Sequence, residues 1–353
     1  MSALLTPLTI RELTLRNRIA VSPMCQYSSE DGFANDWHLV HLGSRAVGGA
    51  ALVIMEASAV EARGRISPQD QGIWKDEHIP FLTRITAFLR QQGAAAGIQL
   101  AHAGRKASTR RPWEGTGIVP PDADGWHPVA PSPVSFQPGD PPPTELTKAE
   151  IIGLSGAFAD AAGRALEAGF QVVELHFAHG YLAHQFLSPL SNFRTDEYGG
   201  SFENRIRFAL EVTLAVRAIW PENLPLFVRI SATDWVEGGW DIDDSVALAR
   251  RLVALGVDLV DCSSGGLSPQ QKIPLGPGYQ VPFAARIRRE AEVLTGAVGM
   301  ITTPRQADEI VRAGDADVVL MAREFLRDPY FPLHAAKALG EAFPPPVQYG
   351  RAF

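Results

Sequence analysis

Two histidines and a tyrosine stand close together directly after an apolar segment of strand length. His176, His179 and Tyr181 follow residues 171–175, which show no helical period and contain strong β formers. Each histidine can donate a hydrogen bond to an oxygen, and the phenol of Tyr181 has a proton to give. Together the three side chains could polarise a carbonyl group and protonate a neighbouring atom, which is acid–base chemistry on a small molecule.

Two other interpretations of the same residues stay open. His176 could be a hydrogen-bonded core histidine and Tyr181 a packed aromatic residue, and the His-x-x-His spacing is also typical of metal ligands. No carboxylate or cysteine is spaced so that it would complete the ligands of a catalytic metal, and we therefore expect no metal.

The composition restricts the class of partner and compartment. Lys and Arg number 32 against 39 Asp and Glu, and this net charge of −7 without a basic run makes nucleic acid and anionic membranes poor partners. Cys25 and Cys262 are too few for a disulfide framework or an iron–sulfur cluster. There is no signal peptide pattern and no apolar stretch of membrane length. We expect a cytoplasmic protein that acts on small molecules.

The strand that positions the cluster is one of several apolar runs, each followed by a helix-like stretch. The runs are residues 19–24, 51–55, 97–101, 171–175, 226–230, 258–262, 293–295 and 317–321. Eight alternating units predict an α/β fold, a single (β/α)8 TIM barrel with parallel strands. We expect one domain over residues 1–353, with a hairpin of residues 8–10 and 13–15 as an N-terminal cap.

Helix boundaries support this alternation, and one long segment interrupts it. Thr147 and Glu150 form a capping-box pattern at the start of a helix over 147–167, and we expect further helices over 202–219 and 243–255. Residues 106–143, after the third strand, are rich in Pro, Gly, Trp and Asp. A loop this long in a compact domain predicts a lid or a subunit contact.

The carboxyl ends of barrel strands surround a single mouth, and the side chains found there suit a planar heterocycle with a phosphate. Gln99 could hydrogen-bond to a ring edge. Arg229 could lie beside an oxygen that becomes negative on reduction, with an ordinary ion pair as the alternative. Gly299 and Arg323, after strands seven and eight, suit a phosphate. Cys25 is either a buried inert thiol or a group that tunes the ring.

At this point the chain resembles the Old Yellow Enzyme family of FMN-dependent ene-reductases, and within it the thermophilic-like branch that includes the xenobiotic reductases. The resemblance runs nearly end to end and rests on the motifs at 16–18, 22–27, 102–107, 174–205, 296–299 and 348–351. Cys25 in place of the threonine found in the other branch, and a pair of histidines at 176 and 179 rather than His and Asn, select the branch.

The resemblance implies non-covalent FMN at the barrel mouth. Its ring would be surrounded by Ser22, Pro23, Met24, Cys25, Ala57, Gln99 and Arg229, and its phosphate end held by Lys106, Gly299, Ala322 and Arg323. Cys25 would modulate the redox potential of the ring.

The resemblance also implies how a substrate and a second subunit are contacted. His176 and His179 would bind the electron-withdrawing oxygen of the substrate, Tyr181 would donate a proton, and Tyr27 would be a further substrate contact. Arg351, on a C-terminal tail of residues 344–353, would enter the active site of a neighbouring subunit, which implies a homodimer or homotetramer. In two places the chain departs from the family pattern: Val298 stands where some xenobiotic reductases have tryptophan, and residues 352–353 lack the tryptophan that often follows the arginine.

We therefore expect a ping-pong ene-reductase, an NADPH dehydrogenase or 2-enone reductase. NADPH, or NADH, would supply hydride through flavin N5 to the activated C=C bond of α,β-unsaturated ketones, aldehydes, imides or nitro compounds. A 2-hydroxy acid oxidase would need a base and carboxylate-binding arginines in a pattern that is not seen here, and a dienoyl-CoA reductase would need cluster cysteines. A flavin carrier or sensor without turnover would not need Tyr181.

Overall fold

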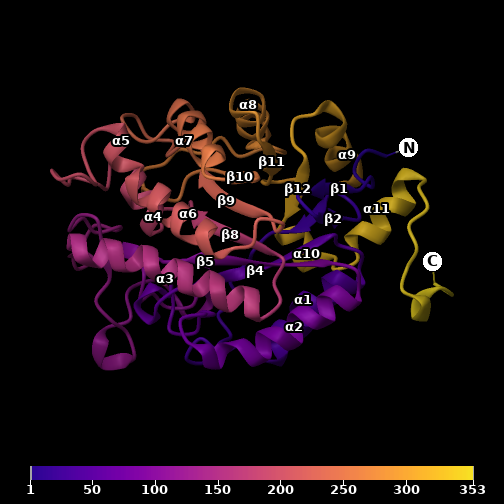
Figure 1. The fold of residues 1–353 in the computed structure, drawn as a ribbon, viewed down its shortest axis with the longest axis horizontal. Coiled ribbons are helices and arrows are strands. Elements are labelled where there is room, and N and C mark those ends of the chain that lie inside the picture. Colours follow the sequence, from indigo (N-terminus) through magenta and orange to yellow (C-terminus); the bar gives the residue numbers. More distant parts are fainter. Residues whose placement is uncertain (1, 353) are drawn as a thin grey trace.

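The computed structural model describes residues 2–352, and its centre is a closed barrel of eight parallel strands (Figure 1). Around the barrel the strands follow one another in chain order, and the last pairs with the first. They are β3 (Ile19–Val21), β4 (Leu52–Ala59), β5 (Ala95–Ala101), β8 (Val172–Phe177), β9 (Leu226–Ser231), β10 (Leu259–Ser263), β11 (Leu294–Ala297) and β12 (Val318–Met321). The predicted (β/α)8 barrel and all of its predicted strands are confirmed.

Helices cover the outside of the barrel (Figure 1). They are α1 (Asp36–Val47), α2 (Ile79–Gln91), α3 (Lys148–Glu167), α4 (Leu182–Leu187), α5 (Phe202–Arg205), α6 (Arg207–Ile219), α7 (Ile242–Ala254), α8 (Val281–Ala291), α9 (Pro304–Ala313), α10 (Arg323–Arg327) and α11 (Phe331–Leu339). The capping box before α3 is confirmed, because the Thr147 hydroxyl accepts from the backbone N–H of Glu150 while the Glu150 carboxylate accepts from that of Thr147. The helix expected over 202–219 is interrupted at Ile206, whose side chain is fully buried.

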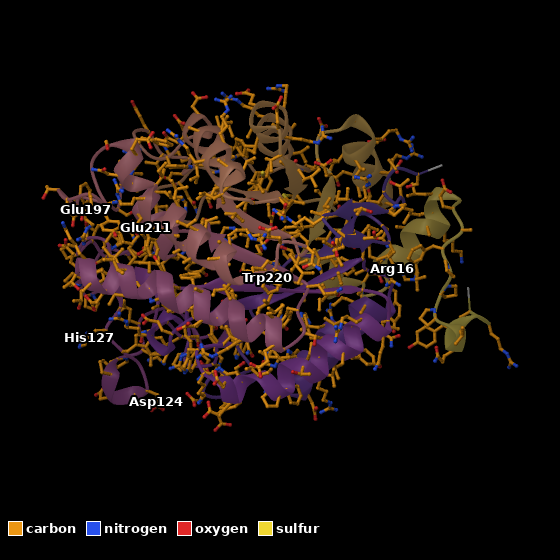
Figure 2. All side chains as sticks on the ribbon, viewed as in Figure 1. Arg16, Asp124, His127, Glu197, Glu211 and Trp220 are labelled. Carbon is orange, nitrogen blue, oxygen red and sulfur yellow. The ribbon has the colours of Figure 1, made fainter. Side chains whose placement is uncertain are left out.

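Two apolar layers hold the fold together. The larger lies between the strands and the helices, where side chains such as the buried Trp220 fill the space (Figure 2). The smaller fills the barrel interior near the amino ends of the strands, where Phe227, Leu259 and Leu320 cluster with Ile10 and Leu13. The last two belong to the predicted antiparallel hairpin of β1 (Leu8–Ile10) and β2 (Leu13–Leu15), so this hairpin closes the barrel at the end opposite the strand carboxyl ends.

The segment 106–143 departs from regular structure, as predicted, and returns to the barrel mouth. It contains the 3₁₀ turns η4 (Pro112–Glu114) and η5 (Pro121–Ala123), and the two-residue strand β6 (Val129–Ala130), which pairs with β7 (Thr144–Glu145). Trp113 in this segment meets the ring of Tyr27 edge to face, with ring centroids 5.8 Å apart. The loop thus contacts one predicted substrate residue.

The tail after α11 leaves the barrel (Figure 1) and forms the short turn η6 (Val347–Tyr349). Phe353, the last residue of the predicted tail 344–353, lies outside the described residues, as does Met1. No helix within residues 2–352 has the length and apolar character needed to cross a membrane.

Candidate active site

His176 lies near the carboxyl end of β8, and a hydrogen bond determines which of its ring nitrogens carries the proton. Its Nδ1 accepts a hydrogen bond from the backbone N–H of Ala178 at 3.3 Å, so the ring proton belongs on Nε2. Burial, followed by the positive charge of Arg229, holds the pKa of His176 well below its ordinary value. The ring is therefore a neutral hydrogen-bond donor at physiological pH.

His179 meets the ring of His176 edge to face, with centroids 5.0 Å apart. Its backbone is left-handed, with φ of 60°, and its N–H donates to Ser231 Oγ at 2.9 Å. Nε2 of His179 lies 2.7 Å from Ser263 Oγ. Ser263 Oγ also lies 3.5 Å from Gln280 Oε1, so its one proton has two acceptors; in the tautomer in which Ser263 donates to Nε2, the proton of His179 is on Nδ1 and can be donated to a ligand. Burial and the charge of Arg229 lower the pKa of this ring too.

Tyr181 completes the cluster, because its ring lies edge to face on His176 with centroids 5.0 Å apart. Among residues 2–352 no side chain or backbone group hydrogen-bonds to its hydroxyl, so the phenol proton is available to a ligand. Burial raises the pKa of Tyr181 well above its ordinary value, and Cys25 and Tyr27 add to this effect. The predicted grouping of His176, His179 and Tyr181 in one place is present in the structure.

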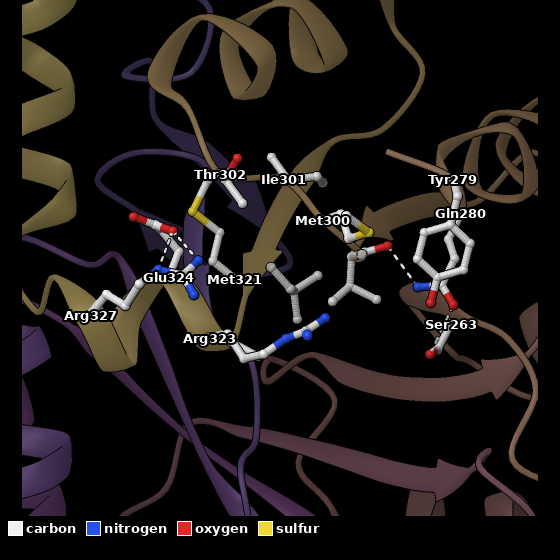
Figure 3. Close-up of a pocket in the computed structure, with 14 residues that line it drawn as sticks. Ser263, Tyr279, Gln280, Met300, Ile301, Thr302, Met321, Arg323, Glu324 and Arg327 are labelled. Atoms are coloured by element: carbon white, nitrogen blue, oxygen red, sulfur yellow. Dashed lines mark hydrogen bonds and ion pairs between the residues drawn. The ribbon is translucent and has the colours of Figure 1, made fainter. Parts of the chain in front are cut away.

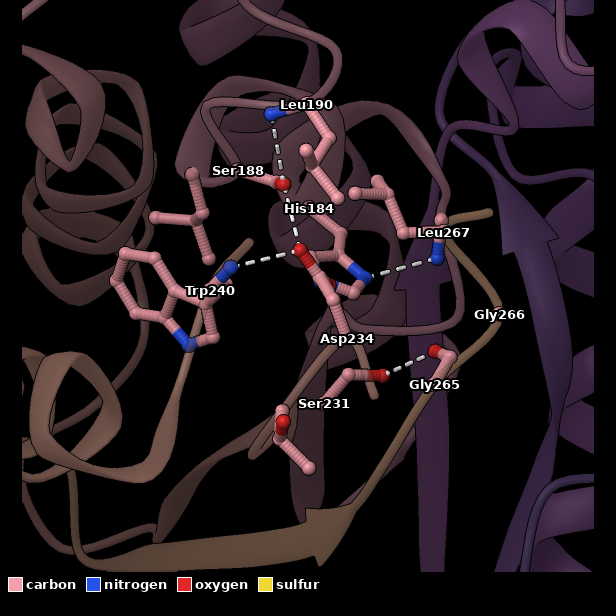
Figure 4. A network of polar contacts seen from close by, with 12 residues as sticks. His184, Ser188, Leu190, Ser231, Asp234, Trp240, Gly265, Gly266 and Leu267 are labelled. Carbon is pink, nitrogen blue, oxygen red and sulfur yellow. Dashed lines mark hydrogen bonds and ion pairs between the residues drawn. The ribbon is translucent and has the colours of Figure 1, made fainter. Parts of the chain in front are cut away.

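A buried network under the turn 178–181 fixes the loop that carries these side chains (Figure 4). The backbone N–H of Gly180 donates to Nδ1 of His184 at 2.9 Å, and Nε2 of His184 lies 2.8 Å from Asp234 Oδ1. The other carboxylate oxygen of Asp234 accepts from Ser188 Oγ at 2.6 Å and from the N–H of Trp240 at 2.8 Å. These hydrogen bonds lower the pKa of Asp234 against the effect of burial, so it stays charged.

Lys106 belongs to this cluster and not to the phosphate end where it was expected. Its Nζ donates to the backbone oxygens of His179 at 2.8 Å and Gly266 at 3.0 Å, and lies 5.1 Å from the centre of the Tyr181 ring. Burial, with a smaller effect of Arg105, lowers the pKa of Lys106 to about 8. Through these two hydrogen bonds the ammonium joins the loops after β8 and β10, and Lys106 is absent from the lining of the cavity described below.

A polar layer crosses the barrel interior next to the histidines, since Arg229 is the register partner of His176 between β8 and β9. Gln99 on β5 donates to Glu174 on β8 at 2.8 Å. Arg229 on β9 donates to Ser22 Oγ at 3.0 Å and pairs with Asp261 on β10 at 3.2 Å. The ion pair considered for Arg229 therefore exists, and it lies inside the barrel.

The end of β3 supplies a second wall. The residues predicted to contact a flavin ring there, Pro23, Met24 and Cys25, are half-buried, and Ala57 on β4 is buried. Burial and then the carboxyl groups of Asp70 and Glu56 raise the pKa of Cys25 well above its ordinary value. Cys25 is therefore a protonated thiol, which is the state expected of a packing or tuning group and not of a nucleophile.

A cavity of about 350 Å³ opens between the ends of β10, β11 and β12 (Figure 3). Its lining includes Gly299, Ala322 and Arg323, all predicted at the phosphate end, and also Tyr279 and Gln280. Figure 3 shows the Arg323 side chain extending into the space, where no described residue pairs with its guanidinium. Gly299 has φ of +116°, and a Cβ there would lie 2.6 Å from Gln280 Nε2. An unpaired guanidinium beside exposed backbone fits a phosphate.

Arg351, which is predicted to enter the site of a neighbouring subunit, lies on the exposed tail of its own chain, in a separate shallow cavity with Tyr330 and Tyr349. Within residues 2–352 no group of three or more His, Cys, Asp or Glu side chains is arranged to hold a metal ion.

Sequence reasoning missed several polar residues of the site. Glu174 and Asp261 fell inside predicted strands, and Ser263, Tyr279 and Gln280 were not among the predicted site residues. The signal for the two acids was available, because a carboxylate inside an apolar strand run is rarely buried without a partner. Tyr279 and Gln280 precede α8 and carried no such signal.

Comparisons with known proteins agree with this geometry. Residues 3–341 match the model of the NADH:flavin oxidoreductase / NADH oxidase family. The chain is 51% identical to an NADPH dehydrogenase of Geobacillus sp. (strain WCH70) over 99% of this chain and 98% of the relative. It is 49% identical to an NADPH dehydrogenase of Bacillus subtilis (strain 168), with 99% of each chain covered.

Solved structures with the same fold include morphinone reductase, with a TM-score of 0.81 and 28% identity over 98% of this chain and 92% of that one. The old yellow enzyme homologue of Zymomonas mobilis has a TM-score of 0.78 and 26% identity, covering 98% of this chain and 95% of that one.

Proposed function

Because the chain belongs to the NADH:flavin oxidoreductase / NADH oxidase family, that of the old yellow enzymes, we propose that this oxidoreductase is an ene-reductase of the xenobiotic reductase branch. Its electron donor is NADPH, with NADH as the alternative. Its substrates are alkenes activated by a ketone, aldehyde, imide or nitro group.

One observation carries the proposal: two neutral imidazoles and a phenol share one site, with the ring of His176 5.0 Å from the rings of both His179 and Tyr181. Nε2–H of His176 and Nδ1–H of His179 can both donate to the oxygen of an enone, which withdraws electrons from its β carbon. Tyr181 then protonates the α carbon. Tyr27 supplies a further contact to the substrate. A flavin carrier would not need these three donors.

The polar layer and the cavity fit FMN. When bound, FMN supplies the redox centre that accepts hydride from the nicotinamide and passes it to the β carbon. Gln99 faces one ring edge, and Arg229 offsets the negative charge that develops on reduction. Pro23, Met24, Cys25 and Ala57 form the apolar wall of the ring. Gly299, Ala322 and Arg323 hold the phosphate, with Ser22 orienting Arg229.

We further propose a homodimer, or a homotetramer built from it, in which Arg351 completes the neighbouring subunit's site. The support is the exposed tail, whose Val347 is 90% exposed, and the position of Arg351 in a cavity other than the one at the mouth. Mixing Tyr181→Phe with Arg351→Ala subunits tests this, because a mixed dimer has one intact site. If the mixture is more active than the average of the two variants measured alone, Arg351 is shared between subunits. If its activity equals that average, the proposal is wrong.

Anaerobic stopped-flow absorbance of the purified protein tests the function itself. Mixing with NADPH should bleach the flavin, and a second mixing with 2-cyclohexenone should restore it. Absence of flavin absorbance, or bleaching that only oxygen reverses, would contradict the proposal.

A further inference from the structure

The polar layer contains two buried acids, Glu174 and Asp261, that the reaction above does not use. We propose that they form a proton-accepting pair, which takes up one solvent proton when hydride arrives on the ring beside Arg229. This inference rests on the proposed function, because it needs a flavin at Arg229. Glu174 and Asp261 are positioning residues in this scheme, since they act through Arg229 and do not touch the substrate.

The strand register brings the members of the layer together. Gln99 is the register partner of Glu174 between β5 and β8, and Arg229 is that of Asp261 between β9 and β10. Each acid is 0% exposed. Asp261 is bound to Arg229 at 3.2 Å, and Glu174 is close enough to both for the charge of Asp261 to raise its pKa and that of Arg229 to lower it. Both acids thus lie next to Arg229.

The donors available to this pair are too few for two carboxylates. Oε2 of Glu174 and both oxygens of Asp261 receive no hydrogen bond from an N–H or hydroxyl of the described chain. Two buried charges with one guanidinium would leave one charge without compensation, which is costly. A proton held between the two carboxyl groups removes that cost and supplies the missing donor.

The surroundings fix which acid holds the first proton. Burial and then the charge of Asp261 raise the pKa of Glu174 to about 8, and burial also raises that of Asp261, against the opposing effect of Arg229. His176 lies two residues after Glu174 on the same face of β8 and is neutral, whereas Cys262 follows Asp261 on the opposite face of β10. At neutral pH the layer therefore holds one proton, one carboxylate and one guanidinium.

Hydride transfer disturbs this balance. The nicotinamide C–H bond breaks, its electron pair and hydrogen move to the ring, and the ring gains one negative charge without taking a proton from water. This charge raises the pKa of Asp261 further, because both lie against Arg229. An O–H bond then forms on the pair with a proton from solvent. Arg229 exchanges its carboxylate partner for the reduced ring, so uptake of the proton supports reduction.

Proton counting tests the inference. The holoenzyme is mixed anaerobically with one equivalent of NADPH at neutral pH in weak buffer with an indicator dye, while flavin bleaching is followed. We expect uptake of about one proton per flavin reduced. Glu174→Gln combined with Asp261→Asn should remove this uptake, because no carboxyl group is then left in the layer, whereas Glu174→Gln alone mimics the protonated Glu174 and should keep the uptake on Asp261. Glu56→Gln is the control. It changes another buried carboxyl group that has no contact to Arg229, and it should leave the proton uptake unchanged.

A reduced-minus-oxidised infrared difference spectrum of the wild-type protein identifies the acceptor even if a variant fails to fold. We expect the carbonyl stretch of a protonated carboxylic acid to gain intensity on reduction. Bleaching without proton uptake, or uptake without a carboxyl signal, would overturn the inference while leaving the ene-reductase proposal intact. Absence of bleaching would overturn both.

Discussion

Ser263 Oγ lies 2.7 Å from Nε2 of His179, and this contact links the two halves of the site. Ser263 is the last residue of β10 and also lines the cavity that contains Gly299 and Arg323. The same hydroxyl therefore contacts His179, the histidine that we propose binds the substrate, and borders the space that we propose holds the cofactor phosphate. The left-handed backbone of His179 needs such an external restraint, since this conformation is unfavourable for a residue with a Cβ.

Ser263→Ala should weaken binding of phenolic ligands roughly fivefold, since a lost hydrogen bond of this kind costs about 1 kcal/mol. The reason is that Nε2 of His179 loses its donor, so the proton is no longer held on Nδ1. The measurement is a titration of the flavin charge-transfer band with a para-substituted phenol. Ser264→Ala, whose parent hydroxyl donates to Gln280 at 2.6 Å, is the control and should bind phenols normally.

Tyr181→Phe should slow the oxidative half-reaction roughly a hundredfold, because a positioned general acid contributes at least that much. Flavin reduction by NADPH needs no proton from Tyr181 and should keep its rate. Stopped-flow absorbance separates the two half-reactions. Equal slowing of both would show that the phenol serves packing and not proton transfer.

The barrel and the donor cluster could be predicted because their signals are local. Each strand is an apolar run followed by a helix, and His176, His179 and Tyr181 follow one such run within a few residues. Closure of the barrel then determines which strand ends share a mouth. The positions of Gln99, Arg229, Gly299 and Arg323 at this mouth follow from topology alone.

The position of Lys106 could not be obtained in this way. Lys106 lies shortly after the end of β5, so topology places it at the mouth. Topology does not say which backbone carbonyls its long side chain reaches. The approach of Gly266 to His179, where a Cβ on the glycine would lie 2.6 Å from the histidine Cα, brings two backbone oxygens within reach of one ammonium. Such a contact between two loops has no signature in either loop alone.

The free energy of unfolding should decrease as the pH is lowered, because α1 contains buried neutral histidines. Burial, then Arg45, lowers the pKa of His41 from 6.5 to about 3. The unfolded chain binds a proton here below pH 6.5 and the folded chain does not until about pH 3, so stability is lost as the pH falls through this window. His41→Leu should make the decrease of Tm with acidification shallower by the equivalent of about one proton.

Thermal unfolding monitored by circular dichroism over this pH range provides the measurement. His127→Leu, at an exposed position, is the matched control and should leave the slope unchanged. An unchanged slope in His41→Leu would show that other groups dominate acid unfolding, with His38 the first to test, since burial lowers its pKa to about 4.

Lys106→Met and Arg323→Met together decide which cation holds the phosphate of FMN. Arg323 extends unpaired into the cavity, whereas Lys106 is bound to the backbone oxygens of His179 and Gly266. We expect Arg323→Met to weaken FMN binding roughly tenfold or more, because a charge-assisted hydrogen bond to phosphate is lost. Lys106→Met should change FMN affinity by less than about twofold and slow the oxidative half-reaction instead, since it releases the loop next to Tyr181.

Quenching of FMN fluorescence by the apoprotein measures these affinities. Arg327→Met is the control within the same cavity, because its guanidinium is already paired with Glu324, and its removal should have a smaller effect than that of Arg323. If Lys106→Met lost FMN as strongly as Arg323→Met, the ammonium would have to leave the two carbonyls when the cofactor binds. The position expected from the sequence, at the phosphate end, would then be the correct one for Lys106.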